Sequence, residues 1–127
     1  MRLEIEIYPP VNGNQYVVLS GRLDTNTYEQ LDDALEPLLM SAKPAMVLVM
    51  DLARLEYISS AGIRSILQAR KTLAGHGGKV LVVHPQAQIQ KVFDVVTAVP
   101  MNVIFSSTSE TVASLDAMLR LVLQGDE

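Results

Sequence analysis

The sequence predicts an α/β fold in one domain, residues 1–127, built on a mostly parallel, mixed sheet of five strands with four helices. From the second strand onward, strand-like apolar segments alternate with segments of helical periodicity, which is typical of right-handed crossovers between parallel strands. The first two strands are instead separated by turn residues that include Asn12-Gly13, a hairpin signal, so we expect an antiparallel edge strand. The predicted order is strand, strand, helix, strand, helix, strand, helix, strand, helix.

The first three elements follow from periodicity and turn signals. Residues 2–8 alternate strictly between polar and apolar side chains, as in a half-buried strand, and residues 15–21 form the strand that pairs with it. The helix that follows is expected to be capped by Asn26 or Thr27, with a glutamate or glutamine three residues later completing a capping box. Pro37 lies inside the apolar repeat of this helix, so we expect a bend or a split there.

A central strand and a second helix frame the middle of the chain. Residues 45–50 are apolar without alternation, as in a strand buried on both faces, and this strand is expected to end at Asp51. Residues 52–58 are predicted to form a crossing loop, and a helix is predicted from Ser60 to about Ala74. The remaining predictions are a glycine-rich stop over residues 75–78, a strand over 79–84, a helix from Pro85 that ends before Pro100, a strand over 102–106 and a final helix from Ser107.

Composition argues against several kinds of partner and site. The net charge is −4 and the lysines and arginines are scattered, whereas nucleic-acid binding needs a clustered basic face. There is no cysteine, and His76 and His84 have no carboxylate cluster beside them in the sequence, so neither a metal nor another cofactor is expected. No apolar run approaches the roughly 20 residues of a membrane helix, and the N-terminus lacks a secretion signal. We therefore expect a cytoplasmic protein without membrane insertion.

Ser59 and Ser60 are the residues on which the choice of function depends. They lie at the predicted start of a helix, where backbone N–H groups are unpaired and the helix dipole is positive, so they could be plain caps or a place for a phosphate. A catalytic serine would need a base nearby, and the chain has no Gly-x-Ser-x-Gly motif, although His84 could point toward the same sheet edge. The glycines of residues 75–78 follow a helix, which is the wrong order for a phosphate-binding loop.

The surroundings of the two serines favour a flat docking surface over a cleft. The apolar side chains just before them are expected to be partly exposed, and the small residues just after them would allow another backbone to come close. Asp24 is expected on the same side of the sheet as the start of this helix. The predicted partner-binding residues are Asp24, Tyr57, Ile58, Ser59, Ser60, Ala61, Gly62 and Arg64.

The stretch over residues 51–63, Asp-Leu-Ala-Arg-Leu-Glu-Tyr-Ile-Ser-Ser-Ala-Gly-Ile, resembles the signature of STAS domains, and in particular that of bacterial anti-sigma factor antagonists. Residues 21–24, 77–79 and 92–94 are similar to the same family, so the resemblance covers nearly the whole chain. It implies a STAS-like fold, with the helices packed mainly on one side of the sheet.

The resemblance also implies a phosphorylation-controlled binding switch, not an enzyme. Such antagonists bind an anti-sigma factor that is itself a serine kinase of the GHKL type, are released when it phosphorylates them, and are reset by a PP2C-type phosphatase. The modified serine lies two residues before the motif glycine, at Ser60, with Ser59 as the second candidate. The alternative is a STAS subunit of a transport or lipid-trafficking complex, which would dock on an ATPase without being phosphorylated.

Overall fold

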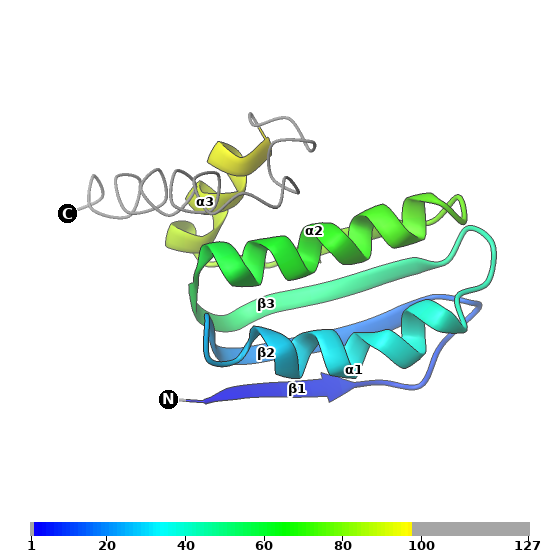
Figure 1. The fold of residues 1–127 in the computed structure, drawn as a ribbon, viewed down its shortest axis with the longest axis horizontal. Helices are drawn as coiled ribbons and strands as arrows, with labels where there is room; N and C mark the ends of the chain where they lie inside the picture. The colour runs from blue at the N-terminus through cyan, green and yellow to red at the C-terminus, as the bar shows by residue number, and fades with distance from the viewer. Residues whose placement is uncertain (1, 98–127) are drawn as a thin grey trace.

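The computed structural model describes residues 2–97 as a four-stranded mixed sheet with three helices (Figure 1). Strand β1 (Leu3–Ile7) pairs antiparallel with β2 (Gln15–Leu23), while β2, β3 (Val47–Ile58) and β4 (Lys79–Val83) are parallel, in the spatial order β1-β2-β3-β4. The predicted mixed sheet and its edge hairpin are therefore confirmed. The predicted strand over 102–106 and the helix from Ser107 lie outside the described residues. The elements are β1 (Leu3–Ile7), β2 (Gln15–Leu23), α1 (Tyr28–Met40), β3 (Val47–Ile58), α2 (Ser60–Ala74), β4 (Lys79–Val83) and α3 (Ala87–Thr97).

Helices α1 and α2 lie side by side on one face of the sheet, and the core fills the space between them and the strands (Figure 1). Strand β2 supplies this core by strict alternation, because every second residue from Gln15 to Leu23 is buried. The other residues of β2 occupy the opposite face, which α1 and α2 leave uncovered. The largest fully buried side chains are Leu19, Leu23, Leu31, Leu35, Leu48, Met50, Leu52, Leu55, Ile58, Ile63, Leu73 and Ile89.

Strand β3 is longer than predicted, and the loop expected over residues 52–58 is wrong. The strand continues through this segment and stays paired with β2 to its end, where Leu23 faces Ile58. Two irregularities in the register with β2 place extra β3 residues in the strand, and Ala53 and Arg54 are consequently both exposed. Since a bulge interrupts the alternation of polar and apolar residues, this half of the strand has the sequence pattern of a loop.

The second half of β3 has no strand beside it on its β4 side within the described residues. Strand β4 pairs only with Val47–Asp51. Beyond that point the side-chain amides of Gln86 and Gln88 donate hydrogen bonds to the carbonyls of Ala53 and Glu56, at 3.0 and 3.4 Å. The start of α3 therefore lies against this edge and satisfies part of its backbone.

Helix α1 differs from the prediction at its N-cap, and Pro37 does not split it. Thr27 is the N-cap, but its side chain makes no capping hydrogen bond, so the predicted capping box is wrong. Its hydroxyl instead accepts from the Asp24 N–H and donates to the Arg22 carbonyl, both at 2.9 Å, which fixes the β2–α1 turn. Pro37 lies inside the helix without splitting it, since α1 continues to Met40.

Candidate functional site

The junction between β3 and α2 carries both serines at the end of the sheet. Ser59 is the N-cap of α2, with an extended backbone at φ −101° and ψ 175°. Its N–H donates to the Leu23 carbonyl at 2.9 Å, and its carbonyl accepts from the Ile63 N–H at 3.0 Å. Its side chain makes no capping bond, and the Oγ atom is buried without a hydrogen-bond partner among the described residues. A plain side-chain cap is therefore not the role of Ser59.

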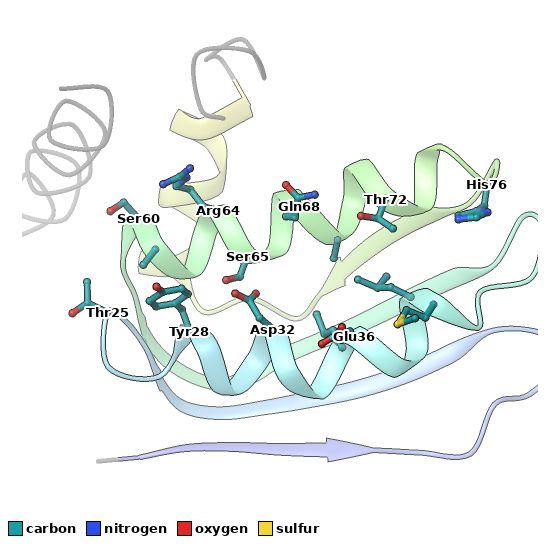
Figure 2. Close-up of a pocket in the computed structure, with 15 residues that line it drawn as sticks. Thr25, Tyr28, Asp32, Glu36, Ser60, Arg64, Ser65, Gln68, Thr72 and His76 are labelled. Atoms are coloured by element: carbon teal, nitrogen blue, oxygen red, sulfur yellow. The ribbon is translucent and has the colours of Figure 1, made fainter. Parts of the chain in front are cut away.

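Ser60 is the first residue of α2 and lies at one end of a groove between α1 and α2. Figure 2 shows it beside Thr25 and Tyr28. The residue is only 2% exposed. The first turn of α2 contains no acidic side chain, so its own sequence leaves the positive end of the helix dipole without a counter-charge. An anionic group added at Ser60 would meet backbone N–H groups and a favourable field.

Asp24 is fixed in the neighbouring β2–α1 turn. Its carboxylate accepts hydrogen bonds from the Asn26 N–H at 2.9 Å and the Thr27 hydroxyl at 3.2 Å, and it lies 3.5 Å from Arg22 Nε. Burial on its own raises the pKa of Asp24, but the hydrogen bonds from Asn26, Thr27 and Arg22 outweigh it and lower the pKa below its ordinary value. Because β2 and β3 end side by side, this ionised carboxylate lies at the same end of the sheet as the start of α2.

Arg22 and Tyr57 form a contact that the sequence did not predict. The guanidinium lies over the tyrosine ring, 4.0 Å from the ring centroid, which is the geometry of a cation–π interaction. The two residues are far apart in the chain and become register partners only through the bulged pairing of β2 with β3. A register shift of this kind leaves no local signal in the sequence.

Three of the predicted docking residues, Ile58, Ser60 and Gly62, are buried, so the partial exposure expected for Ile58 and the close approach of another backbone at Gly62 are wrong. Ile58 is 1% exposed, within the core. A Cβ atom on Gly62 would lie 2.6 Å from Leu23 Cγ and 3.0 Å from Ile58 Cγ1. The missing side chain therefore lets α2 pack on the strand ends, and does not open the helix to another chain. Partly exposed side chains at this junction belong to Tyr57, Ala61 and Arg64.

Neither histidine lies near Ser60. His84 follows β4, and its Nδ1 atom is 3.6 Å from Asp51 Oδ2. Strand β3 continues for seven residues from Asp51 to Ile58, about 23 Å at the rise of a strand. His76 follows α2 and lies at the other end of the groove from Ser60 (Figure 2). The geometry therefore does not provide the serine with an imidazole base.

Asp51 is the centre of a second polar cluster, on the uncovered face of the sheet. It accepts a hydrogen bond from the Tyr16 hydroxyl at 2.5 Å and one from the Ala53 N–H at 3.0 Å. The bond from Tyr16 is the main cause that lowers the pKa of Asp51, helped by Ala53 and His84 against the opposing effect of burial. The same bond raises the pKa of Tyr16. The cluster ties β2 to β3.

No group of three or more His, Cys, Asp or Glu residues that could hold a metal ion gathers within residues 2–97. Over the same range, no helix is long and apolar enough to cross a membrane.

The groove between α1 and α2 has a volume of about 1020 Å³, and residues of both helices line it (Figure 2). Thr25, Tyr28 and Ser60 form one end, and Met40 and His76 line the other. One feature of the sequence indicates this groove. Small side chains recur every fourth residue on the groove side of α2, and they cannot fill the space between two helices. These small residues are Ala61, Ser65 and Ala69.

Comparison with known proteins identifies the family of this fold. Residues 12–98 match the family model described as Mlab, STAS domain. Over 85 residues the chain is 31% identical to BtrV of Bordetella bronchiseptica, which is named as an anti-sigma factor antagonist. That match covers 67% of this chain and 72% of BtrV.

Solved structures have the same fold. The anti-sigma factor antagonist SpoIIAA in its unphosphorylated form matches with a TM-score of 0.66 at 19% identity, over 74% of this chain and 81% of SpoIIAA. An anti-sigma factor antagonist from Mycobacterium paratuberculosis matches with a TM-score of 0.61 at 20% identity, over 90% of this chain and 95% of its own. With the family model spanning most of the described residues, this chain belongs to the STAS domain family.

Proposed function

We propose that this chain is an anti-sigma factor antagonist, and that phosphorylation of Ser60 controls its binding to the anti-sigma factor. The name of BtrV, a relative at 31% identity, supports the antagonist role. The observation that carries the switch is the position of Ser60, at a helix N-terminus without acidic neighbours in its first turn and at the same sheet end as the anchored Asp24. As the resemblance implies, the anti-sigma factor is the GHKL-type kinase, a PP2C-type phosphatase reverses the reaction, and the exchange takes place in the cytoplasm.

The physical effect of a phosphate differs between the fold and the interface. A phosphate adds about −1.5 to −2 charges, which the N–H groups and the dipole of α2 tolerate, so the fold survives. At the docking surface the same group occupies space, demands desolvation and adds to the negative charge of Asp24. A penalty of a few kcal/mol reduces the affinity about a hundredfold.

The burial of Ser60 constrains when it is modified. Because the residue is only 2% exposed, its hydroxyl can attack the γ-phosphate of ATP bound to a kinase only after the local cover is displaced. The docked anti-sigma factor is in the position to do this. Modification therefore takes place within the complex, and release follows from it.

The site is tested by incubating wild type, Ser60→Ala and Ser59→Ala with the cognate kinase and ATP, followed by mass spectrometry. We expect one added phosphate on wild type and on Ser59→Ala, and none on Ser60→Ala. Phosphorylation of Ser60→Ala to the wild-type extent would show the assignment to be wrong, and a loss confined to Ser59→Ala would move it to Ser59.

The switch is tested by calorimetry of Ser60→Asp and Ser60→Ala with the anti-sigma factor. We expect Ser60→Asp to bind about a hundredfold more weakly than wild type while its circular dichroism spectrum is unchanged, and Ser60→Ala to bind well. Wild-type affinity of Ser60→Asp would overturn the switch. If neither serine is ever modified and the native partner is a transport ATPase, the alternative of a STAS subunit replaces this proposal.

A further inference from the structure

The groove between α1 and α2 has one acidic wall. Helix α1 carries Glu29, Asp32, Asp33 and Glu36 but no lysine or arginine, and Asp32 and Glu36 line the groove. Neither of these two carboxylates forms an ion pair within the part of the chain that the structure describes. The wall is therefore a pair of carboxylates without an ion pair, while Arg64 of α2 lines the groove nearer its Ser60 end (Figure 2).

This arrangement costs the free protein stability. Asp32 and Glu36 are four residues apart on one helix, and like charges at that spacing are neighbours that repel. The dipole of α1 favours negative side chains only within the first turn of the helix, and Glu36 lies beyond that turn. Two cations placed in the groove would turn this repulsion into attraction, so the wall favours a cationic occupant.

The floor of the groove is apolar and the length suits a helix. Leu35 and Leu39 of α1 line it together with the small side chains of α2, and Met40, which is 81% exposed, also lines it and has a flexible side chain that can adapt to a partner. Helix α2 has 15 residues, about 22 Å of length. A helix of similar length, with an apolar face and a basic flank, matches the floor, the acidic wall and the long axis.

We propose that the groove is the seat of a basic amphipathic helix of the anti-sigma factor, with apolar side chains on the floor and lysines or arginines opposite Asp32 and Glu36. This inference rests on the proposed function and specifies the partner surface that it uses. Ser60 lies at one end of the same groove. A phosphate at Ser60 would therefore stand at the end of the seated helix, which links modification to release.

The acidic wall is tested by reversing charge in two matched pairs on α1. Asp32→Lys with Glu36→Lys alters the groove, whereas Glu29→Lys with Asp33→Lys makes the same change of net charge at residues that do not line it. Binding to the cognate anti-sigma factor is measured by calorimetry, after circular dichroism confirms folding. We expect the groove pair to lose roughly tenfold or more in affinity and the control pair to stay within about threefold of wild type. Equal losses in both pairs, or none in either, would overturn the proposal.

The occupant is identified by photo-cross-linking. A benzoylphenylalanine replaces Gln68, which lines the groove, or Arg70, which is exposed on α2 but does not line it. We expect the Gln68 variant to capture a segment of the anti-sigma factor with apolar residues every three or four positions and flanking lysines or arginines. An adduct from the Arg70 variant alone, or capture of an acidic segment in the groove, would contradict the proposal that the groove binds a basic helix.

The two proposals fail in different ways. If Ser60→Asp binds weakly while the groove pair binds like wild type, the proposal of a helix bound in the groove is wrong and the phosphorylation switch is retained. If the groove pair binds weakly while Ser60→Asp binds like wild type, the phosphorylation switch is wrong and the proposal of a helix bound in the groove is retained.

Discussion

Gly62 is the residue at which α2 meets the ends of β2 and β3. A methyl group there would press on Leu23 and Ile58, both of which are buried and have no room to retreat. We expect Gly62→Ala to lower the free energy of unfolding by about 1–3 kcal/mol, as overpacking of a core does. Urea unfolding followed by circular dichroism measures this.

Gly75→Ala is the matched control. Gly75 has φ −64°, which alanine adopts without strain, and a Cβ atom there would lie 3.3 Å from the Thr72 carbonyl oxygen. We expect the free energy of unfolding of Gly75→Ala to stay within about 1 kcal/mol of that of wild type. If Gly62→Ala were as stable as this control, the close packing of α2 on the strand ends would not be the reason for a glycine at this position.

The hydrogen bond from Tyr16 to Asp51 makes stability depend on pH. Since this bond is the main cause that lowers the pKa of Asp51 in the folded chain, it contributes stability above the unfolded pKa, and that stability is lost as the pH falls through the folded pKa. Tyr16→Phe should therefore be less stable than wild type at pH 7, and the gap should narrow below about pH 4. Urea unfolding between pH 7 and pH 3 measures the gap.

Tyr28→Phe serves as the comparison for Tyr16→Phe, because it removes an exposed hydroxyl whose bond to Glu29 measures 3.2 Å. We expect it to remain close to wild type across the pH range. A gap between wild type and Tyr16→Phe that is as wide at pH 3 as at pH 7 would argue against the role given to Asp51.

The sequence identified candidate residues near one another in the chain better than those that meet across strands. Ser60 and its helix start followed from a local pattern, and Asp24 followed from the order of the elements. The contact of Arg22 with Tyr57 and the bond of Tyr16 to Asp51 depend on strand register, which two bulges alter. The burial of Ile58 is not predictable from the local pattern for a related reason, because the bulged segment before it has the sequence pattern of a loop.

At the scale of elements, α1 retains a proline that a free helix would not favour. Pro37 removes one backbone hydrogen bond inside a helix that nevertheless continues to Met40. Packing of Leu31 and Leu35 on the sheet therefore holds the helix together against its local propensity. Local propensity predicts a bend or a split at Pro37, and the split is absent because propensity does not include this tertiary contribution.

Pro37→Ala should stabilise the fold. The variant regains a helical hydrogen bond, which we expect to raise the free energy of unfolding by about 1–3 kcal/mol. Pro44→Ala, in the loop before β3, should instead lower the free energy of unfolding by about 0.4–1 kcal/mol, because the unfolded chain gains conformational freedom. Thermal unfolding of the two variants distinguishes them, and a destabilised Pro37→Ala would mean that the proline serves the native packing of α1.

At the scale of the whole molecule, the helix order and the parallel sheet followed from the alternation of sequence patterns, whereas the groove did not. A groove is the space left between two helices, so it depends on the distance between α1 and α2 and on side chains from both. The sequence shows which residues of α2 are small, but it does not show that those of α1 fail to fill the gap. This is why the acidic wall could be recognised only in the folded chain.

Salt dependence separates the local charges of the groove from the net charge of −4 that the whole chain carries. The net charge attracts any basic partner over long distances, and salt screens that attraction in every variant. We expect the affinity for the anti-sigma factor to fall as salt rises from about 0.05 to about 0.5 M. Asp32→Asn with Glu36→Gln should flatten this slope, because these side chains face the partner's cations. Glu29→Gln with Asp33→Asn, which changes the net charge equally, should leave most of the slope, and identical slopes for the two pairs would mean that only net charge acts.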